Sequence, residues 1–284
     1  MFKTIQPLVF SFDVEWVPDP LAAARLFGSA VSTRGEREHA MRKLWEYGGA
    51  TEDKPRPYLK TVLCRVVTLA GILREQTGNG EKPNLRLISL PLQKELPWHV
   101  QERSILQGFF ESVGSRKPQL VGFNSSQADI PILVQRAIVN GLSCPGFATR
   151  PDKPWEGVDY FSNFSEHNVD LAPFLGRYNQ MPSLNELARL SGIPGKIDTS
   201  GSGVADLWLE ERIDRILAYN EFDAFTTHLV WARFARFIGL LPDPRYQAEL
   251  EAVRELAVAH AENGKPHLKD FLAEWDRLDS IRPE

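Results

Sequence analysis

One short apolar segment near the N-terminus, residues 8–16, constrains the fold of this chain more than any other stretch. It is apolar, β-branched or aromatic at most positions, which predicts a buried strand, and it carries two acids, Asp13 and Glu15. Because residues two apart in a strand point to the same side, the two carboxylates project together. They are either solvated acids at a strand end or half of a site for Mg²⁺ or Mn²⁺, which prefer carboxylate oxygen.

A second acidic stretch follows a later strand. The apolar residues 119–123 predict a short strand that runs into a turn containing Asn124, and Asp129 then opens a helix with Pro131 in its first turn. A carboxylate at a helix start complements the helix dipole. Asp129 is therefore either an N-terminal helix residue with no further role or another ligand of the same site.

A third stretch lies inside a long helical pattern from about residue 212 to 239. Tyr219 and Asp223 stand four positions apart there, so they share one face of the helix. The pair is either an exposed tyrosine beside a solvated acid or a further part of the site that Asp13 and Glu15 begin.

In this order the three stretches resemble the three motifs of the DEDD 3′–5′ exonucleases, and the tyrosine matches the DEDDy branch. Within that branch the chain resembles the bacterial predicted exonucleases related to the proofreading domain of B-family DNA polymerases, over roughly residues 7–240. It departs from them at Ala128, where an aromatic residue is usual, and at Cys64, where histidine is expected. Neither departure removes a carboxylate.

The order of predicted elements indicates the fold class. Strands at residues 8–16, 62–73 and 85–90 come first, and helices alternate with strands afterwards, which is typical of an α/β, ribonuclease H-like fold with a mixed central sheet flanked by helices. We expect an exonuclease domain over residues 1–241. Residues 16–61 form a helical insertion within it, and residues 242–284 form a C-terminal helical extension.

The insertion carries eight basic and six acidic residues, with aromatic side chains among them at Phe27, Trp45, Tyr47 and Tyr58. Basic and aromatic residues together suit single-strand binding through the phosphate backbone and base stacking. The alternative, which we favour for any one of these residues, is that the insertion helices pack on the core. A loop rich in glycine and serine is expected at residues 195–203, on the substrate side.

Charge is distributed unevenly along the chain. The net charge is −4, and residues 242–284 hold ten acidic and six basic residues, so the body of the chain is neutral. A neutral body suits an enzyme that holds a strand end at metal ions rather than one that coats long duplexes. The two cysteines give no disulfide framework, and no signal-peptide or transmembrane run is present, so we expect a soluble, cytoplasmic protein without membrane contact.

The family resemblance implies a metal site of four acids that hold two divalent cations, Mg²⁺ or Mn²⁺: Asp13, Glu15, Asp129 and Asp223. The first ion is held by Asp13, Glu15 and Asp223. Asp13 bridges to the second ion, which Asp129 reaches largely through water. Two such ions, roughly 4 Å apart, activate a water and stabilise the leaving 3′-oxygen.

The resemblance also implies roles for three other residues. Tyr219 hydrogen-bonds the attacking water, and because the ordinary pKa of tyrosine is near 10, an orienting role suits it better than that of a free base. Asn124 and Phe12 contact the terminal nucleotide.

The function that follows is hydrolysis of terminal phosphodiester bonds at the 3′ ends of single-stranded DNA, with release of 5′-mononucleotides, as in DNA repair. Two alternatives stay open. The same core acts equally on RNA, because the metal ions do not distinguish the sugars. A non-catalytic nucleic-acid-binding module is the alternative from another class, and the presence of all five motif residues counts against it.

Overall fold

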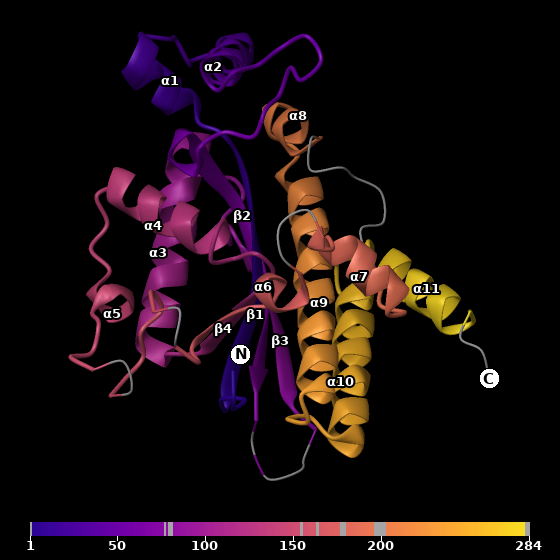
Figure 1. Cartoon of the computed structure of the whole chain (residues 1–284). Helices are drawn as coiled ribbons and strands as arrows, with labels where there is room; N and C mark the ends of the chain where they lie inside the picture. Colours follow the sequence, from indigo (N-terminus) through magenta and orange to yellow (C-terminus); the bar gives the residue numbers. More distant parts are fainter. Residues whose placement is uncertain are drawn as a thin grey trace.

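The computed structural model of the chain describes residues 2–76, 78, 82–153, 156–162, 165–176, 180–195 and 203–281. Most of the glycine- and serine-rich loop expected at residues 195–203 lies outside these residues. A single sheet with helices on both sides forms the centre of the molecule, and two helices stand above it at one end (Figure 1).

The sheet has five strands in the order β3-β2-β1-β4-β5. The first three strands pair antiparallel, whereas β4 runs parallel to β1 and β5 runs parallel to β4. This mixed sheet flanked by helices confirms the predicted ribonuclease H-like α/β fold. The strands are β1 (Leu8–Pro18), β2 (Cys64–Glu75), β3 (Asn84–Leu90), β4 (Gln119–Gly122) and β5 (Asn168–Asp170).

Most of the helices lie where the hydrophobic periodicity predicts them. Three short ones were not expected, α5, α6 and α8, because a helix of one or two turns gives little periodic signal. The helices are α1 (Pro20–Phe27), α2 (Arg34–Tyr47), α3 (Trp98–Arg116), α4 (Asp129–Val139), α5 (Pro145–Ala148), α6 (Ala172–Leu175), α7 (Leu184–Leu190), α8 (Val204–Leu209), α9 (Ile213–Phe237), α10 (Asp243–Glu262) and α11 (Leu268–Asp279), with a 3₁₀ turn, η1, at Thr61–Leu63.

Alternate side chains of the central strand β1 point to opposite faces of the sheet. Phe10, Phe12 and Val14 enter a core cluster with residues of α3 and α4. Val9 and Val17, on the other face, pack in clusters that contain residues of α9. Asp13 and Glu15 lie on the same face as Val9 and Val17, so the strand directs both carboxylates toward α9.

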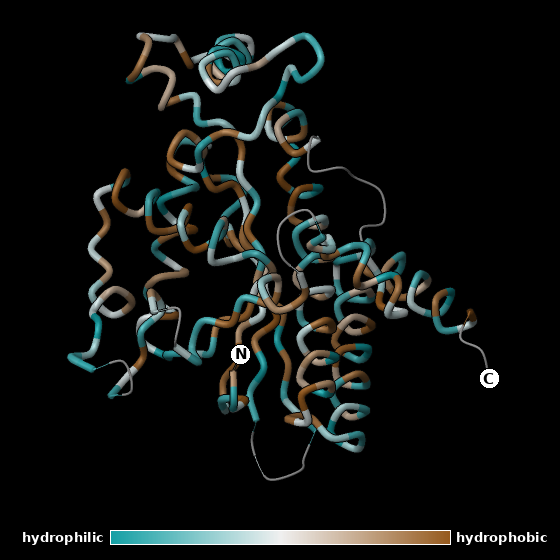
Figure 2. Tube along the Cα trace, viewed as in Figure 1, coloured by the Kyte–Doolittle hydropathy of each residue, from teal (hydrophilic) through white to brown (hydrophobic). Residues whose placement is uncertain are grey.

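Helix α9 crosses β1 and β2 and is buried along most of its 25 residues. It ends at Phe237, and Gly239 follows with a φ of 79°, a left-handed conformation that glycine adopts without strain. The hydrophobic colour in Figure 2 runs along the central strands and into this helix, as expected for a core between sheet and helix.

A buried network of charged side chains joins the start of the insertion to β2, α3 and α4. Asp19 caps α1 and is fully buried, and its carboxylate accepts a hydrogen bond of 2.6 Å from Arg136 of α4. Arg136 also donates to Glu102 of α3 at 2.7 Å, and Arg65 of β2 lies 3.5 Å from Asp19. Helix α4 is thereby held at one position relative to β2 and α3.

The C-terminal helices share the core of the domain. Tyr246, Val253 and Phe271 of α10 and α11 belong to the same buried cluster as Val9 of β1 and Val121 of β4. The segment expected as an extension therefore packs against the main sheet through α9 and β3.

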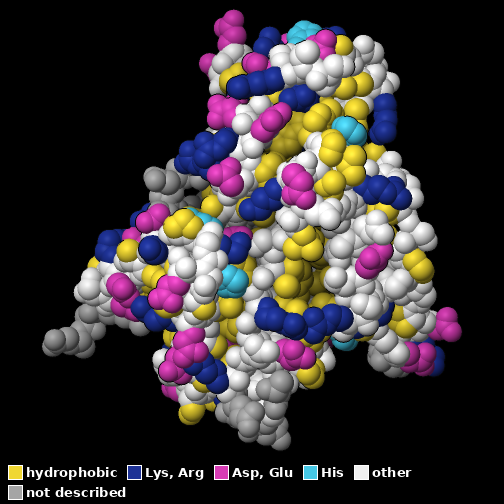
Figure 3. Space-filling view, turned by 180° about the vertical axis from the view of Figure 1, so that it is seen from behind, with side chains coloured by type: hydrophobic (Ala, Val, Ile, Leu, Met, Phe, Trp, Pro, Cys, Tyr) yellow, Lys and Arg dark blue, Asp and Glu magenta, His cyan; other side chains and the backbone are white. Residues whose placement is uncertain are grey.

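The surface is mixed in character. The face opposite to that of Figure 1 shows a vertical strip of hydrophobic side chains with lysine and arginine around it (Figure 3). Among the described residues no helix combines the length and the apolar character needed to cross a membrane.

Candidate metal centre and active site

Three of the predicted acids converge between β1 and α9. Asp13, Glu15 and Asp223 each contribute a carboxylate oxygen, and these oxygens all lie within 4.8 Å of one another. Asp13 and Glu15 are half-buried, and Asp223 is 4% exposed. Carboxylates this close repel one another unless a cation or a proton lies between them. The set of hard oxygen donors fits Mg²⁺ or Mn²⁺.

Asp129 lies at the edge of this group. It is the first residue of α4 and is 5% exposed, and its carboxylate accepts hydrogen bonds from its own backbone N–H and from that of Val14. Burial, followed by the charges of Asp170 and Asp223, raises the pKa of Asp129 to about 7. The fold thus brings the fourth predicted acid close to Asp223, although it is not part of the tight group of three.

Tyr219 lies on the same face of α9 as Asp223 and is 6% exposed. Its phenol hydroxyl donates a hydrogen bond to the Asp223 carboxylate. Burial raises the pKa of Tyr219 far above its usual value, and the charges of Asp223, Glu15 and Asp13 raise it further. In the metal-free protein the phenol is therefore in the form that donates a hydrogen bond.

Asn220 contacts the site but was not predicted. Its side-chain amide donates a 2.7 Å hydrogen bond to Oδ2 of Asp13, and the residue is fully buried. The amide oxygen Oδ1 has no hydrogen-bond partner among the described residues. Asparagine is a poor helix former, so an asparagine in the interior of a long predicted helix, next to Tyr219, was the available signal in the sequence.

Glu221 anchors the opposite side of α9. It lies about 200° around the helix from Tyr219, at about 100° per residue, and is fully buried. Its carboxylate accepts a hydrogen bond of 2.6 Å from Ser89 of β3, lies 2.7 Å from Nε2 of His267, and pairs with Lys265. The turn between α10 and α11 thereby holds the helix segment that carries Tyr219 and Asp223.

Asp170, at the end of β5, organises the turn before α4. It accepts hydrogen bonds from the backbone N–H groups of Asn124 at 2.7 Å and Ser126 at 3.0 Å. Asn124 adopts a positive φ of 62° there, and its side chain is exposed. Asp170 is thus a structural acid, and the turn that it orders leads directly to Asp129.

Phe12 does not face the carboxylates. Its side chain is 1% exposed and packs against Phe10 and Phe109 in the core, with ring centroids 5.8 Å and 5.7 Å away. Because alternate residues of a strand point to opposite faces, Phe12 projects away from Asp13. The buried side chain therefore offers no surface to a nucleotide.

A serine, a histidine and a glutamate also form a hydrogen-bonded chain, but it lies inside the core. Oγ of Ser11 lies 3.0 Å from Nδ1 of His228, and Nε2 of His228 lies 3.0 Å from Glu249, which pairs with Arg74. Ser11, His228 and Glu249 are all fully buried. No substrate reaches Ser11, so this chain joins β1, α9 and α10 and does not supply a nucleophile.

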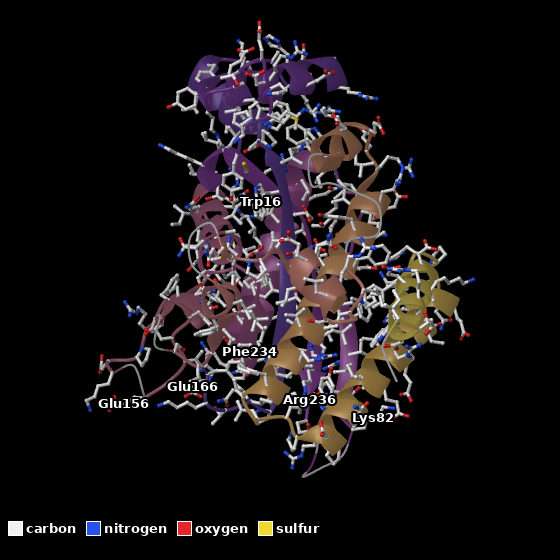
Figure 4. The ribbon with its side chains drawn as sticks, turned by 45° about the vertical axis from the view of Figure 1, so that its right-hand side comes forward. Trp16, Lys82, Glu156, Glu166, Phe234 and Arg236 are labelled. Carbon is white, nitrogen blue, oxygen red and sulfur yellow. The ribbon has the colours of Figure 1, made fainter. Side chains whose placement is uncertain are left out.

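An apolar cavity of about 630 Å³ lies between α6, α7 and α9, lined in part by Phe174, Leu187 and Phe234. It is remote from the acids. Trp16, the neighbour of Glu15, lies toward the upper end of the ribbon beneath the helical insertion, whereas Phe234 and Arg236 lie near its lower end (Figure 4). Tyr219 and Asp223 lie in the N-terminal half of α9, whereas Phe234 lies in its last turn.

Fold and site together define a class: a ribonuclease H-like protein with an acidic cluster suited to divalent cations. The chain belongs to the family described as predicted 3′–5′ exonucleases related to the exonuclease domain of PolB, whose model matches residues 56–275. This match confirms the family resemblance drawn from the motifs. It begins after β1, so the position of Asp13 and Glu15 in the site rests on the geometry of this structure.

The solved structures that are similar to this chain include the family B DNA polymerase from the hyperthermophilic archaeon Pyrobaculum calidifontis, with a TM-score of 0.46 and 17% sequence identity. The match covers 91% of this chain and 29% of the polymerase chain, so the protein spans less than a third of that polymerase. No curated protein matches the chain.

The raised pKa of Asp129 gives a stability prediction for the metal-free protein. An acid whose pKa is raised on folding favours the folded state fully below the unfolded pKa, near 4, and this advantage is lost as the pH rises through about 7. We expect Asp129→Asn to remove a penalty of up to about 4 kcal/mol at pH 8. Urea unfolding in chelator at pH 5 and pH 8 measures it.

The matched control for this prediction is Asp53→Asn, at an exposed position in the insertion. We expect Asp129→Asn to unfold at higher urea than wild type at pH 8 and to differ less at pH 5, while Asp53→Asn follows wild type at both. An equal effect of Asp129→Asn at the two pH values would contradict a titrating Asp129.

Proposed function

We propose that the protein is a 3′–5′ exonuclease that hydrolyses the terminal phosphodiester bonds of single-stranded DNA and releases 5′-mononucleotides with the help of two divalent cations. The observation that carries this proposal is the convergence of Asp13, Glu15 and Asp223 within 4.8 Å, next to the Tyr219 hydroxyl, in a member of an exonuclease family. The neutral charge of residues 1–241 supports a preference for strand ends over duplexes.

The four acids divide between two ion positions. Asp13, Glu15 and Asp223 would hold one cation, and Asp13 with Asp129 would hold the second. When bound, Mg²⁺ or Mn²⁺ supplies Lewis acidity that lowers the pKa of water and stabilises negative charge on the leaving 3′-oxygen. Asn220 holds the Asp13 carboxylate in one orientation through its 2.7 Å hydrogen bond to Oδ2.

Tyr219 and Asn124 act on the substrate side. Because the ordinary pKa of tyrosine is near 10, the Tyr219 hydroxyl suits an orienting role toward the attacking water better than the removal of its proton. Asn124 has an exposed side chain on the turn before Asp129, where it can contact the terminal nucleotide. The strain of its positive φ is offset by the hydrogen bond that its N–H donates to Asp170.

Cleavage should require a divalent cation, because the site consists of closely spaced carboxylates that can bind one. Ser11 is buried and cannot act as a nucleophile. We expect a 5′-labelled single strand to be shortened from its 3′ end with Mg²⁺ or Mn²⁺ and to stay intact in excess chelator. Chromatography of the small product distinguishes a 5′-mononucleotide from a 3′-mononucleotide.

Matched DNA and RNA strands of one sequence test the substrate class in the same assay. We expect faster shortening of DNA. Full nucleotide release in excess chelator would contradict a metal-dependent mechanism, and shortening from the 5′ end would contradict the polarity. Faster cleavage of the RNA strand would leave the mechanism intact and reassign the substrate.

A further inference from the structure

One exposed aromatic side chain of the insertion differs from the rest. Tyr58 is 67% exposed and has no aromatic neighbour among the described residues. The other exposed aromatic side chains among the described residues each contact a second ring: Phe27 and Tyr47 contact one another, Phe161 contacts Phe147, and Phe174 and Phe237 contact Phe234. Tyr58 therefore presents an uncovered ring to solvent.

The chain is fixed immediately before Tyr58. Arg56 donates two hydrogen bonds, of 2.7 Å and 2.8 Å, to the carboxylate of Asp206 in α8, and its guanidinium lies 5.0 Å from the ring centroid of Trp45. A two-point pair of this kind sets direction as well as distance. In Figure 1 the segment between α2 and β2 passes beside α8, where this pair forms.

The chain is fixed again immediately after Tyr58. Leu59 is buried in the core, and the Thr61 hydroxyl donates a 2.8 Å hydrogen bond to Gln135 of α4. The carbonyl of Val62 accepts a hydrogen bond from Arg136 of the same helix at 3.4 Å. Tyr58 thus lies on a short segment that spans from α8 to α4 and is held at both ends.

The two helices joined by this segment both flank the carboxylates. Helix α4 begins with Asp129, and α8 packs on β1, where Trp208 shares a cluster with Val17 and Tyr219. Burial raises the pKa of the Tyr58 phenol, and the charges of Cys64 and then Asp129 raise it further. The segment that carries Tyr58 therefore connects two helices that flank the site.

We propose that Tyr58 is a stacking platform for a nucleobase at the 3′ end of the bound single strand, an inference that rests on the proposed exonuclease function. A lone exposed tyrosine is ordinary on a protein surface and by itself indicates nothing. A ring that is uncovered, on a segment held from both sides between two helices that flank the acids, has a surface ready to stack on a base with little loss of conformational freedom.

The proposal also assigns a task to part of the insertion. Stacking is tolerant of sequence because every base has a π-face, so Tyr58 would hold a strand end of any sequence near the acids. A base already paired and stacked in a duplex does not offer its face to Tyr58 without unpairing, which favours single strands.

The experiment uses a short single strand with 2-aminopurine, a fluorescent base whose emission falls on stacking, at the 3′-terminal position, the next one or the one after. Binding is measured in chelator, where no cleavage occurs. Tyr58→Leu removes the aromatic ring, and Tyr58→Phe keeps it. Tyr47→Leu is the matched control, because Tyr47 is equally exposed, at 65%, but packs against Phe27 in the same insertion.

We expect wild type and Tyr58→Phe to quench one of the three probe positions and to bind alike, within about twofold. Tyr58→Leu should lose the quenching and bind about 5- to 150-fold more weakly. A strand that lacks the base at that position should bind wild type and Tyr58→Leu equally. Tyr47→Leu should behave as wild type.

Two results would overturn the proposal: unchanged quenching and affinity in Tyr58→Leu, or an equal loss of affinity on the strands with and without the base. The outcome is separable from the proposed function. Cleavage by wild type with no effect of Tyr58→Leu rejects the stacking role alone. Base-dependent binding without any metal-dependent cleavage rejects the exonuclease function and leaves Tyr58 as a single-strand contact.

Discussion

Asp223→Ala is expected to lower the rate of 3′-end cleavage by about a thousandfold or more, because a metal ion contributes several kcal/mol to transition-state stabilisation and each 1.4 kcal/mol is about tenfold in rate. Asp223 shares the 4.8 Å group with Asp13 and Glu15 and also accepts the hydrogen bond of Tyr219. Asp13→Ala should have a similar effect, since Asp13 is common to both proposed ion positions. Single-turnover rates with saturating Mg²⁺ measure both variants.

The fold should survive these substitutions. Removing one of several close carboxylates relieves repulsion, so we expect the melting temperature in chelator to be unchanged or higher than that of wild type. Asp223→Asn keeps the shape and an acceptor for Tyr219 while losing the charge, and higher Mn²⁺ should restore its activity in part at most. Asp214→Asn, at the exposed start of the same helix, is the matched control. Near-normal turnover by Asp223→Ala and Asp13→Ala would show that the site is assigned wrongly.

The elements that carry the acids were predictable because their periodicity is strong. Residues 8–16 have the composition of a buried strand, and a strand places Asp13 and Glu15 on one face. Residues of α9 have the spacing of a long helix, and a helix places Tyr219 and Asp223 on one face. The meeting of the two faces required the sheet order and the crossing of α9 over β1, which the family resemblance supplied and the structure describes.

The residues that support the acids were not predictable in the same way. The bond from Asn220 to Asp13 and the anchor of Glu221 at Lys265 and His267 join residues that are far apart in the sequence. Such pairs leave no local pattern, and a buried asparagine or glutamate is visible only as an exception to helix amphipathicity. The contacts between the C-terminal helices and α9 also leave no local pattern, so these helices were predicted to be an extension of the domain. The turn between them nevertheless holds α9, the helix that carries Asp223.

For Phe12, in contrast, the local pattern was informative and was not used. The period of two in β1 places its side chain opposite to Asp13 and into the core, where it contacts Phe109. The expectation that it contacts a nucleotide came from the resemblance and not from this local pattern. Where the two disagree at a single side chain, the local geometry of the strand is the better guide, because a one-residue shift reverses the face.

Tyr219→Phe is expected to slow cleavage by about 10²–10⁴-fold, the usual contribution of a group that positions or transfers a proton. The substitution removes only the hydroxyl that donates to Asp223, so the carboxylate group and the packing around the ring remain. Substrate affinity, measured in chelator, should change little. An orienting role without proton transfer predicts that the pH profile of the residual rate keeps the wild-type shape.

Tyr160→Phe provides the matched control for this variant. Tyr160 is also buried, at 1% exposure, and its hydroxyl donates a 2.8 Å hydrogen bond to the carbonyl of Pro118, in a core cluster of α3 and α5 residues away from Tyr219. Loss of that hydroxyl should lower stability by about 1 kcal/mol and leave the rate of cleavage unchanged. If Tyr219→Phe cleaves within about twofold of wild type, well short of the range for a positioning group, then the hydroxyl does no more than the buried one at Tyr160. The phenol would then hold Asp223 in place without acting on the water.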